Sequence, residues 1–409
     1  MKYVKLKEIC DLQNGYAFKS SDYIDESNVL NCRMSNIRPN ASFDIEYSPK
    51  YLPEEFAEKY REYLLNDGDL VIAMTDLAND PKILGVPTIV NTKGYQLLLN
   101  QRVGKLIIKN KKLINEKYLK YALSLPQHKS YYKKFAGGGL QINIGKEHIL
   151  NIEIPITEYE NQIKIVNILN KSQELIDKRK EQIGELDKLI KSQFIEMFGD
   201  PAFNPKNWKV VELGYLLREK ASNGFFAKND EYKANGNSKV MWLGDIINRR
   251  YSNIYGLKSV DATEVQLNKY RVQYGDLLFC RSSLNKDGIG KASAVPKNVD
   301  NNIMFECHVI RTPLDLSKCV PEFIQVQSTL HYFRNQIMSN SKTATMTTIG
   351  QDGIITTKVI LPDLELQKQF VEIIYQIDKL KFEMEKSLKE LEDNFNSLMQ
   401  KAFKGELFN

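Results

Sequence analysis

The chain has 409 residues, of which 42% are hydrophobic and 26% are charged, and its formal net charge is +6. That length exceeds one ordinary core, so we expect a soluble globular protein with at least two domains. No window approaches the ~20 apolar residues of a membrane span, and no apolar signal core follows Met1. We therefore expect no membrane contact and a cytoplasmic location. The mildly basic balance permits nucleic-acid binding without requiring it.

The first part of the chain, residues 1–156, is predicted to be a domain of short strands, turns and one helix. A strand begins the domain near residues 4–9, and further strands are predicted at 32–38, 68–73, 103–108 and 152–155. The apolar spacing over 116–125 predicts a helix that ends at Pro126. Strands and helices mixed in this order predict an α+β domain.

A long helix is predicted over residues 157–199. Leu169, Ile176, Ile183 and Ile190 are seven residues apart and form one apolar stripe, which is typical of a helix that pairs with another. Thr157 with Glu160 has the form of a capping box at the start. A glycine and a proline, Gly199 and Pro201, end the helix.

A second long helix is predicted over residues 363–409. The same seven-residue spacing recurs in Phe370, Ile377, Met384, Leu391 and Leu398. Each helix has about 41 residues and would be roughly 60 Å long. The two apolar stripes match each other, so we predict that the helices pack together as an antiparallel coiled coil.

The order of signals in residues 1–199 repeats in residues 200–409. Leu6 recurs as Leu213, the Gly-Asp-Leu turn at 68–70 recurs at 275–277, and Gln162 recurs as Gln369, each 207 residues later. This pattern indicates a tandem duplication. The predicted parts are a domain at 1–156, a helix at 157–199, a second domain at 200–362 and a second helix at 363–409.

Duplication has a geometric consequence if the helices pack antiparallel. The two domains would then lie at opposite ends and be related by an approximate two-fold axis. The alternative is that each helix folds back over its own domain. We favour the first arrangement because the stripes run along the full length of both helices.

The sequence contains no recognisable catalytic or metal-binding cluster. Its five cysteines form no Cys-x-x-Cys pair, and its four histidines lack metal-ligand spacing. Gly145-Lys146 and Gly290-Lys291 both fail the phosphate-loop pattern, and Asp69 and Asp276 sit in turns that they are expected to cap. We therefore predict no metal, no bound cofactor and no catalytic residue, as in a binding or scaffolding protein.

Loops at matching places in the two repeats carry side chains suited to nucleic acid. Arginine can fork onto guanine, asparagine can pair with adenine, and lysine can hold phosphate. Aromatic rings mix with these groups near residues 16–19 and 225–228. The candidate DNA-contacting residues are Tyr16, Lys19, Arg33, Asn36, Arg38, Thr75, Lys228, Arg281, Ser282, Asn285 and Lys286.

Taken together, these features resemble the specificity subunit of type I restriction-modification systems. The resemblance covers almost the whole chain. Its signs are an apolar-Pro segment before each long helix, Gly-Asp-Leu in each half, the segment 139–145, and Phe198-Gly199-Asp200-Pro201 leading to Trp208. Their duplicated order carries the resemblance, since none of these motifs is specific alone.

The resemblance implies two target recognition domains, each reading one half of a split DNA target, with the paired helices setting the unread spacer. It implies a non-catalytic subunit that assembles with two modification subunits, which methylate adenine using S-adenosylmethionine. It also implies motor-nuclease restriction subunits that use ATP and magnesium. Different loops in the two repeats predict an asymmetric target. Two other hypotheses are a coiled-coil adaptor that binds protein, and an enzyme whose site escapes sequence inspection.

Overall fold

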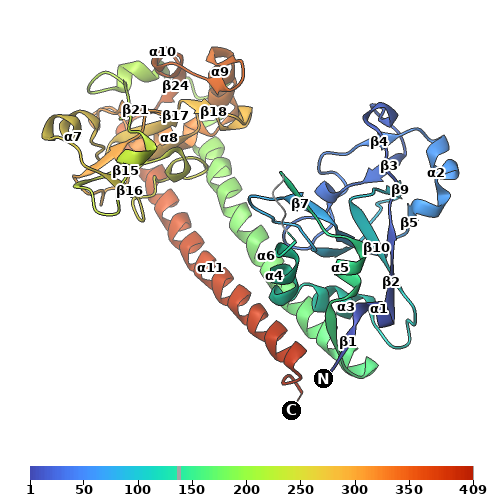
Figure 1. The fold of residues 1–409 in the computed structure, drawn as a ribbon. Coiled ribbons are helices and arrows are strands. Elements are labelled where there is room, and N and C mark those ends of the chain that lie inside the picture. Colours follow the sequence, from blue (N-terminus) through green and yellow to red (C-terminus); the bar gives the residue numbers. More distant parts are fainter. Residues whose placement is uncertain (136–139, 409) are drawn as a thin grey trace. The chain divides into compact units, whose positions relative to one another are not determined.

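The computed structural model describes residues 1–135 and 140–408 (Figure 1). Gly139, the first residue of the 139–145 segment, lies outside the described residues. The chain divides into two compact units, one of residues 1–179 with 387–409 and the other of residues 180–386. Each unit therefore contains one α+β domain and a part of each long helix.

In the first unit, two four-stranded sheets form the body of the domain. One has the order β2-β10-β6-β8 and is antiparallel, and the other has the order β4-β3-β9-β5 with β3 and β9 parallel. The pairs β1-β12 and β11-β7 complete the strands. The strands are β1 (Lys2–Lys5), β2 (Cys10–Asn14), β3 (Val29–Cys32), β4 (Tyr51–Leu52), β5 (Leu64–Leu65), β6 (Leu70–Ala73), β7 (Thr75–Leu77), β8 (Pro87–Ile89), β9 (Gln96–Leu99), β10 (Val103–Ile108), β11 (Gln141–Asn143) and β12 (Glu153–Ile156). The short helices are α1 (Leu6–Ile9), α2 (Glu55–Lys59), α3 (Glu116–Leu123), α4 (Pro126–Lys133) and α5 (Lys146–Leu150).

The second unit repeats this plan. Its main sheet has the order β14-β21-β17-β19, and a three-stranded sheet has the order β16-β15-β20 with β15 and β20 parallel. The pair β13-β24 and the sheet β18-β23-β22 correspond to β1-β12 and β7-β11. The strands are β13 (Lys209–Glu212), β14 (Ser222–Asn223), β15 (Ser238–Met241), β16 (Lys258–Val260), β17 (Asp276–Cys280), β18 (Ser282–Ser283), β19 (Ala292–Ala294), β20 (Ile303–Phe305), β21 (Val309–Pro313), β22 (Lys342–Thr343), β23 (Thr347–Thr348) and β24 (Lys358–Leu361). The short helices are α7 (Glu264–Tyr270), α8 (Pro321–Ser328), α9 (His331–Asn340) and α10 (Gln351–Ile355).

The two predicted long helices are α6 (Tyr159–Phe198) and α11 (Leu364–Lys404). In the first unit, Ile165, Val166 and Leu169 of α6 share a core with residues near the end of α11, Met399 and Phe403. In the second unit, the end of α6 shares a core with the start of α11. The helices therefore pack together antiparallel, as predicted, and each helix contributes to the cores of both domains.

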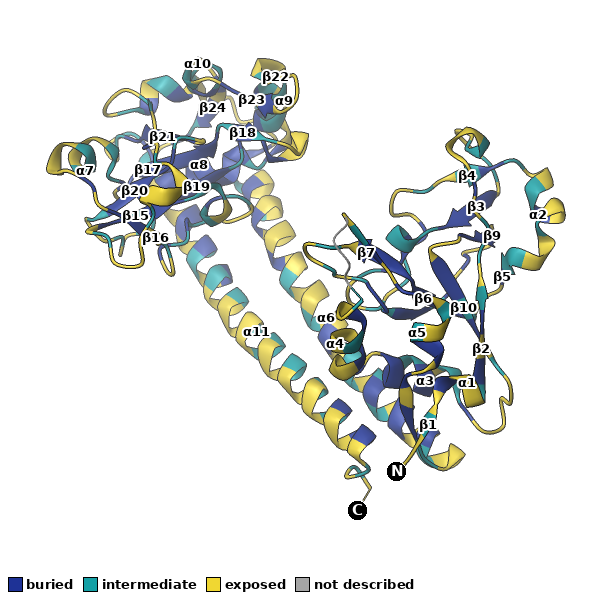
Figure 2. Cartoon of the chain, in the orientation of Figure 1, coloured by how far each residue is buried: buried dark blue, intermediate teal, exposed yellow. Residues whose placement is uncertain are grey.

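The heptad stripe is only partly buried (Figure 2). Leu169, Ile176, Ile190, Phe370 and Ile377 are buried, as the spacing predicts. Ile183, Met384, Leu391 and Leu398 are only half-buried, and Ile183 and Leu391 join neither of the cores that the helices share. Near its end, α6 does not bury side chains at the predicted seven-residue spacing. It buries side chains spaced by four residues: Leu186, Ile190, Phe194 and Phe198. The helix ends thus pack as surface helices of a globular domain pack.

Two buried glutamines anchor the starts of the long helices. The Gln162 side-chain amide accepts a hydrogen bond from Asn115 N at 2.9 Å and donates to Leu113 O and Thr157 O. Gln367 likewise accepts from Val320 N at 2.9 Å and donates to Pro362 O. The predicted match of Gln162 with Gln369 is therefore wrong, because Gln367 holds the equivalent position and Gln369 is exposed.

The Gly-Asp-Leu turns are built as expected. Asp69 Oδ2 accepts from Asn66 N at 2.8 Å, and Asp276 Oδ2 accepts from Gln273 N at 3.0 Å. Asp276 is buried, and burial raises the pKa of its carboxyl despite the neighbouring Arg311 and Arg218. These carboxylates stabilise the turns in which they lie, which agrees with the capping role that the sequence indicates.

His128 on α4 makes the stability of the first unit pH-dependent. The side chain is 4% exposed, and burial lowers its pKa from 6.5 to about 4. The unfolded chain therefore binds more protons than the folded one between these values. We expect the free energy of unfolding to fall as the pH drops from 6.5 towards 4, by at most about 3 kcal/mol. Hydrogen exchange of peptides from α3 and α4 should show this slope, and His128→Gln should flatten it while His331→Gln, in the second unit, leaves it unchanged.

No helix in the described part of the chain combines the length and apolar character that a membrane crossing needs.

Candidate nucleic-acid interface

In each unit, the central strand of the main sheet continues into a short ribbon that carries candidate residues. Strand β6 runs through Met74 into β7, which pairs with β11, and β17 runs through Arg281 into β18, which pairs with β23. Ile144 N donates to Met74 O, and Ile349 N donates to Arg281 O. The matching hydrogen bonds show that Met74 and Arg281 occupy equivalent positions.

Arg281 and the loop after it present polar groups to solvent. Its guanidinium is half-buried and donates to Cys307 O at 3.2 Å, which leaves other donors of the guanidinium free to bind a ligand. Asn285 and Lys286 are exposed, and Asn285 Oδ1 accepts from Asp287 N at 3.0 Å. Leu284, between these groups, is 84% exposed. This loop can offer both charged and apolar contacts.

Two of the candidate residues, Thr75 and Ser282, are buried. They are 3% and 7% exposed, so a base could not reach either hydroxyl easily. The Thr75 hydroxyl donates to Asn143 Oδ1 at 2.7 Å, and Ser282 Oγ lies 2.7 Å from His308 Nδ1. Asn143 and His308 are exposed. The two hydroxyls therefore orient the exposed side chains of Asn143 and His308. Contact of Thr75 and Ser282 with DNA stays a prediction.

The loop that holds Tyr16 and Lys19 passes close to the backbone of a neighbouring strand at Gly15. The loop that holds Lys228 does the same at Gly224. A Cβ atom on Gly15 would lie 2.3 Å from Leu99 O, and one on Gly224 would lie 2.4 Å from Phe305 O, so only glycine fits at either position. The exposed Lys19 and Lys228 each begin a 3₁₀ turn. Both ammonium groups are free of hydrogen bonds to the described residues, so they can meet phosphate.

Tyr16 belongs to an aromatic cluster. Its ring lies 4.4 Å from that of Tyr60 and 5.0 Å from that of Phe18, between ring centroids. Interaction with the Tyr60 hydroxyl raises the pKa of Tyr16 above its ordinary value. Tyr16 is half-buried.

The predicted strand over 32–38 is wrong, because β3 ends at Cys32 and a 3₁₀ turn, η2 (Met34–Asn36), follows. Asn36 is 3% exposed; its Oδ1 accepts from Arg33 N at 2.8 Å and its amide donates to Asp44 O. In the second unit Asp245 makes the same turn by accepting from Trp242 N at 2.9 Å. The Asn36 amide therefore closes a loop, and its contact with a base stays a prediction.

Arg33 and Arg38 flank that turn. Arg33 is half-buried, and its guanidinium makes no hydrogen bond or ion pair with the residues that the structure describes. The Arg38 guanidinium lies 3.6 Å from the centroid of the Tyr47 ring, a cation–π contact that fixes its direction. Both remain candidates for contact with an anionic partner.

Sequence inspection missed Arg102. Met74 N donates to Arg102 O, as Arg281 N donates to His308 O, so Arg102 and His308 are equivalent. Arg102 is exposed. The two units therefore place an arginine beside the ribbon from different segments, since Arg102 precedes β10 and Arg281 follows β17. Only alignment of the two repeats with each other could have indicated this.

Glu306, Cys307 and His308 have potential ligand atoms that all lie within 4.8 Å of one another. Glu306 Oε1 accepts from Leu243 N at 2.9 Å, and His308 Nδ1 is shared with Ser282. Burial raises the pKa of the Cys307 thiol and thereby disfavours the thiolate that a metal needs. The internal hydrogen bonds account for two of the three groups, and the absence of a metal stays a prediction.

Comparisons with known proteins agree with this architecture. The family model described as the type I restriction modification DNA specificity domain matches residues 1–187 and 205–393. The chain is 22% identical to the EcoKI specificity subunit of Escherichia coli over 429 residues, which covers 98% of this chain and 87% of that protein. It is 34% identical to the MjaVIII specificity subunit of Methanocaldococcus jannaschii over 192 residues, but that match spans only 43% of the relative.

One solved structure shows the same fold over nearly the whole chain. It comes from work on complex assembly and conformational transition of the type I restriction-modification system, with a TM-score of 0.54, 16% identity and coverage of 99% of this chain and 98% of that one. The family model matches most of the chain, in two copies that follow the duplication in the fold. The chain therefore belongs to the type I restriction-modification DNA specificity family and is the non-catalytic DNA specificity subunit of such a system.

Proposed function

We propose that each recognition domain reads one half of a split DNA target, and that the complex directs adenine methylation and cleavage by partner subunits. The observation that carries this proposal is the duplicated arrangement of a ribbon, a Gly-dependent loop and exposed cations in both units. Lysine and arginine at such places can neutralise phosphate and contact base edges. The coiled-coil adaptor without DNA specificity is disfavoured by the family membership.

The proposed target is asymmetric because equivalent positions differ chemically. Arg281 in the second unit replaces Met74 in the first, and His308 replaces Arg102. An arginine can donate two hydrogen bonds to guanine, whereas a methionine offers only an apolar contact. The two half-sites should therefore have different sequences.

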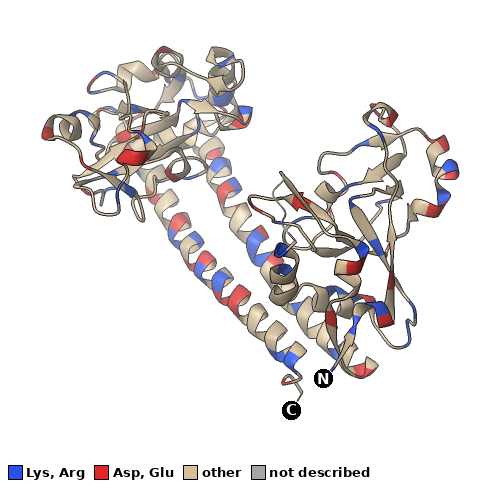
Figure 3. Ribbon diagram, viewed as in Figure 1, with Lys and Arg blue, Asp and Glu red and all other residues tan. Residues whose placement is uncertain are grey.

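The long helices have surfaces suited to partner subunits. Large apolar side chains on them are 40–65% exposed: Ile163, Leu175, Leu189 and Ile195 of α6, and Leu380 and Phe382 of α11. Lys and Arg alternate with Asp and Glu along both helices (Figure 3). Such a mixed surface can bind protein. The proposed partners are two modification subunits, which would use S-adenosylmethionine, and motor-nuclease restriction subunits, which would use ATP and magnesium.

We also propose that the chain works in the cytoplasm. Its five cysteines are free thiols in the structure, and a reducing compartment would keep them so.

Arg281→Ala should weaken binding of cognate DNA by about 1–3 kcal/mol if the guanidinium reads a guanine, and should relax specificity at one position. Lys286→Ala should weaken binding to all sequences and reduce the salt dependence by about one counterion. Fluorescence anisotropy with cognate and scrambled duplexes across a salt series separates the two effects. Equal loss on both duplexes for Arg281→Ala would assign that side chain to phosphate instead of a base.

A further inference from the structure

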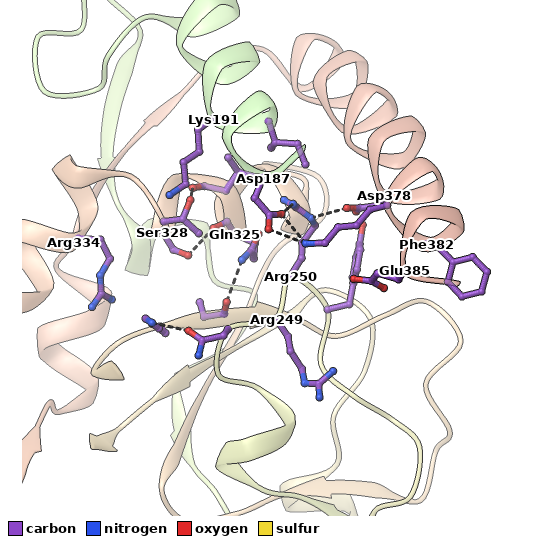
Figure 4. Close-up of a pocket in the computed structure, with 18 residues that line it drawn as sticks. Asp187, Lys191, Arg249, Arg250, Gln325, Ser328, Arg334, Asp378, Phe382 and Glu385 are labelled. Carbon is purple, nitrogen blue, oxygen red and sulfur yellow. Dashed lines mark hydrogen bonds and ion pairs between the residues drawn. The ribbon is translucent and has the colours of Figure 1, made fainter. Parts of the chain in front are cut away.

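The second unit contains a pocket of about 670 Å³ beside the long helices. Its walls come from α6, α8, α9 and α11, and from a loop around residues 248–251 (Figure 4). None of the candidate DNA-contacting residues lines this pocket. It is therefore a feature separate from the proposed interface with DNA.

Buried polar atoms that line the pocket lack hydrogen-bond partners among the described residues. They are Tyr251 Oη, Gln325 Oε1, Arg334 Nη1 and Asp378 Oδ2. Gln325 is 97% buried, and its amide nitrogen already donates to Ala292 O at 3.1 Å. Asp378 Oδ1 is bound to Arg250 Nε at 3.1 Å, so only its second oxygen is unpaired. A buried polar atom without a partner is costly, which indicates that another molecule satisfies these atoms.

The charges in the pocket are unbalanced. Six cationic residues line it, against the three acids Asp187, Asp378 and Glu385. The acids are largely occupied, because Asp187 pairs with Lys381 at 2.8 Å and Asp378 pairs with Arg250. In contrast, four of the cations have no ion-pair partner among the described residues: Lys191, Arg249, Lys291 and Arg334. The pocket therefore favours a ligand with negative charge.

The unpaired atoms also define what else the ligand must carry. Gln325 Oε1 can accept a hydrogen bond but cannot donate one, and the same is true of Asp378 Oδ2 when the carboxyl is ionised. The ligand must therefore offer hydrogen-bond donors as well as anionic groups. A DNA backbone offers phosphate acceptors but no donors. A peptide with acidic side chains offers both carboxylates and backbone N–H groups. Phe382, 65% exposed at the same pocket, adds an apolar contact for such a chain.

We infer that this pocket binds an acidic peptide segment of a modification subunit. The inference rests on the proposed function, because it names the site at which a partner of that assembly would dock. The carboxylates of the peptide would contact Lys191 and Arg249, which are exposed. A backbone N–H of the peptide would donate to Gln325 Oε1.

The test uses the full-length chain and the purified modification subunit of the same system. The double variant Lys191→Glu, Arg249→Glu reverses two exposed charges at the pocket. The control Lys220→Glu, Lys358→Glu makes the same change in net charge at two exposed residues of the second unit outside it. We expect the pocket variant to bind the modification subunit at least about tenfold more weakly in biolayer interferometry, and the control to bind like the unaltered chain.

A second measurement identifies the occupant. A photo-crosslinking residue in place of Phe382 should attach to a modification-subunit segment rich in aspartate and glutamate. Crosslinks to DNA only, or equal affinities for the pocket variant and the control, would overturn the inference while leaving the proposed function intact. If the unaltered chain does not bind the modification subunit, the proposed partnership is overturned together with the inference.

Discussion

Phe370→Ala should destabilise the second unit by about 3–5 kcal/mol, because it empties the centre of an aromatic cluster. Phe370 is 0% exposed, and its ring lies 5.5 Å from that of Phe194 and 5.4 Å from that of Phe198. Phe323 completes the cluster with a ring centroid 6.2 Å away. These four rings join α11, α6 and α8, so the substitution loosens both long helices where they meet the domain core.

Urea unfolding followed by tryptophan fluorescence is a selective measurement of this effect. Both tryptophans, Trp208 and Trp242, lie in the second unit, so their emission reports on that unit alone. Phe382→Ala is the matched control, since Phe382 lies on the same helix but is 65% exposed, and its loss should change stability by less than about 0.5 kcal/mol. Equal stability of the two variants would show that α11 does not pack on this core.

Gln367→Ala should cost roughly 3 kcal/mol or more in the same unit. The substitution leaves Val320 N and Pro362 O without their side-chain partner in a buried place, and each loss costs about 1–3 kcal/mol. Gln367 also ties the N-cap residue of α8 to the start of α11, so we expect faster hydrogen exchange at both helix starts.

Gln369→Ala provides the control for that prediction. Gln369 lies two residues further along α11 and is exposed, so its substitution should leave the unfolding transition nearly unchanged. In the first unit, Gln162→Ala should behave like Gln367→Ala, because Gln162 makes the same bonds to the segment before α3. A larger loss for Gln369→Ala than for Gln367→Ala would reverse the structural assignment.

The sequence was sufficient to predict the long helices and the duplication. Apolar spacing and capping signals are local, so the ends of α6 and α11 fall within a few residues of their predicted positions. The match of Gln162 with Gln369 failed because loop lengths differ between the repeats, and only hydrogen bonds to Asn115 and Val320 identify the true equivalents.

The candidate interface was harder to predict, because the exposure and hydrogen bonding of each side chain determine whether it can contact a ligand. Asn36, Thr75 and Ser282 have suitable chemistry, yet each is buried and hydrogen-bonded to another residue of its own unit. Residue type alone could not reveal this. The pocket was not predictable at all, since its lining residues are spread from 187 to 385 and meet only in the folded unit.

We propose that this chain sets the DNA sequence at which partner subunits act on adenine. The most direct measurement is mapping of methylated adenine in DNA from cells that produce the chain with its modification subunit, compared with cells that lack the chain. We expect a split motif with two different half-sites that vanishes without the chain. An unchanged methylation pattern, with the modification subunit present and active, would contradict the account.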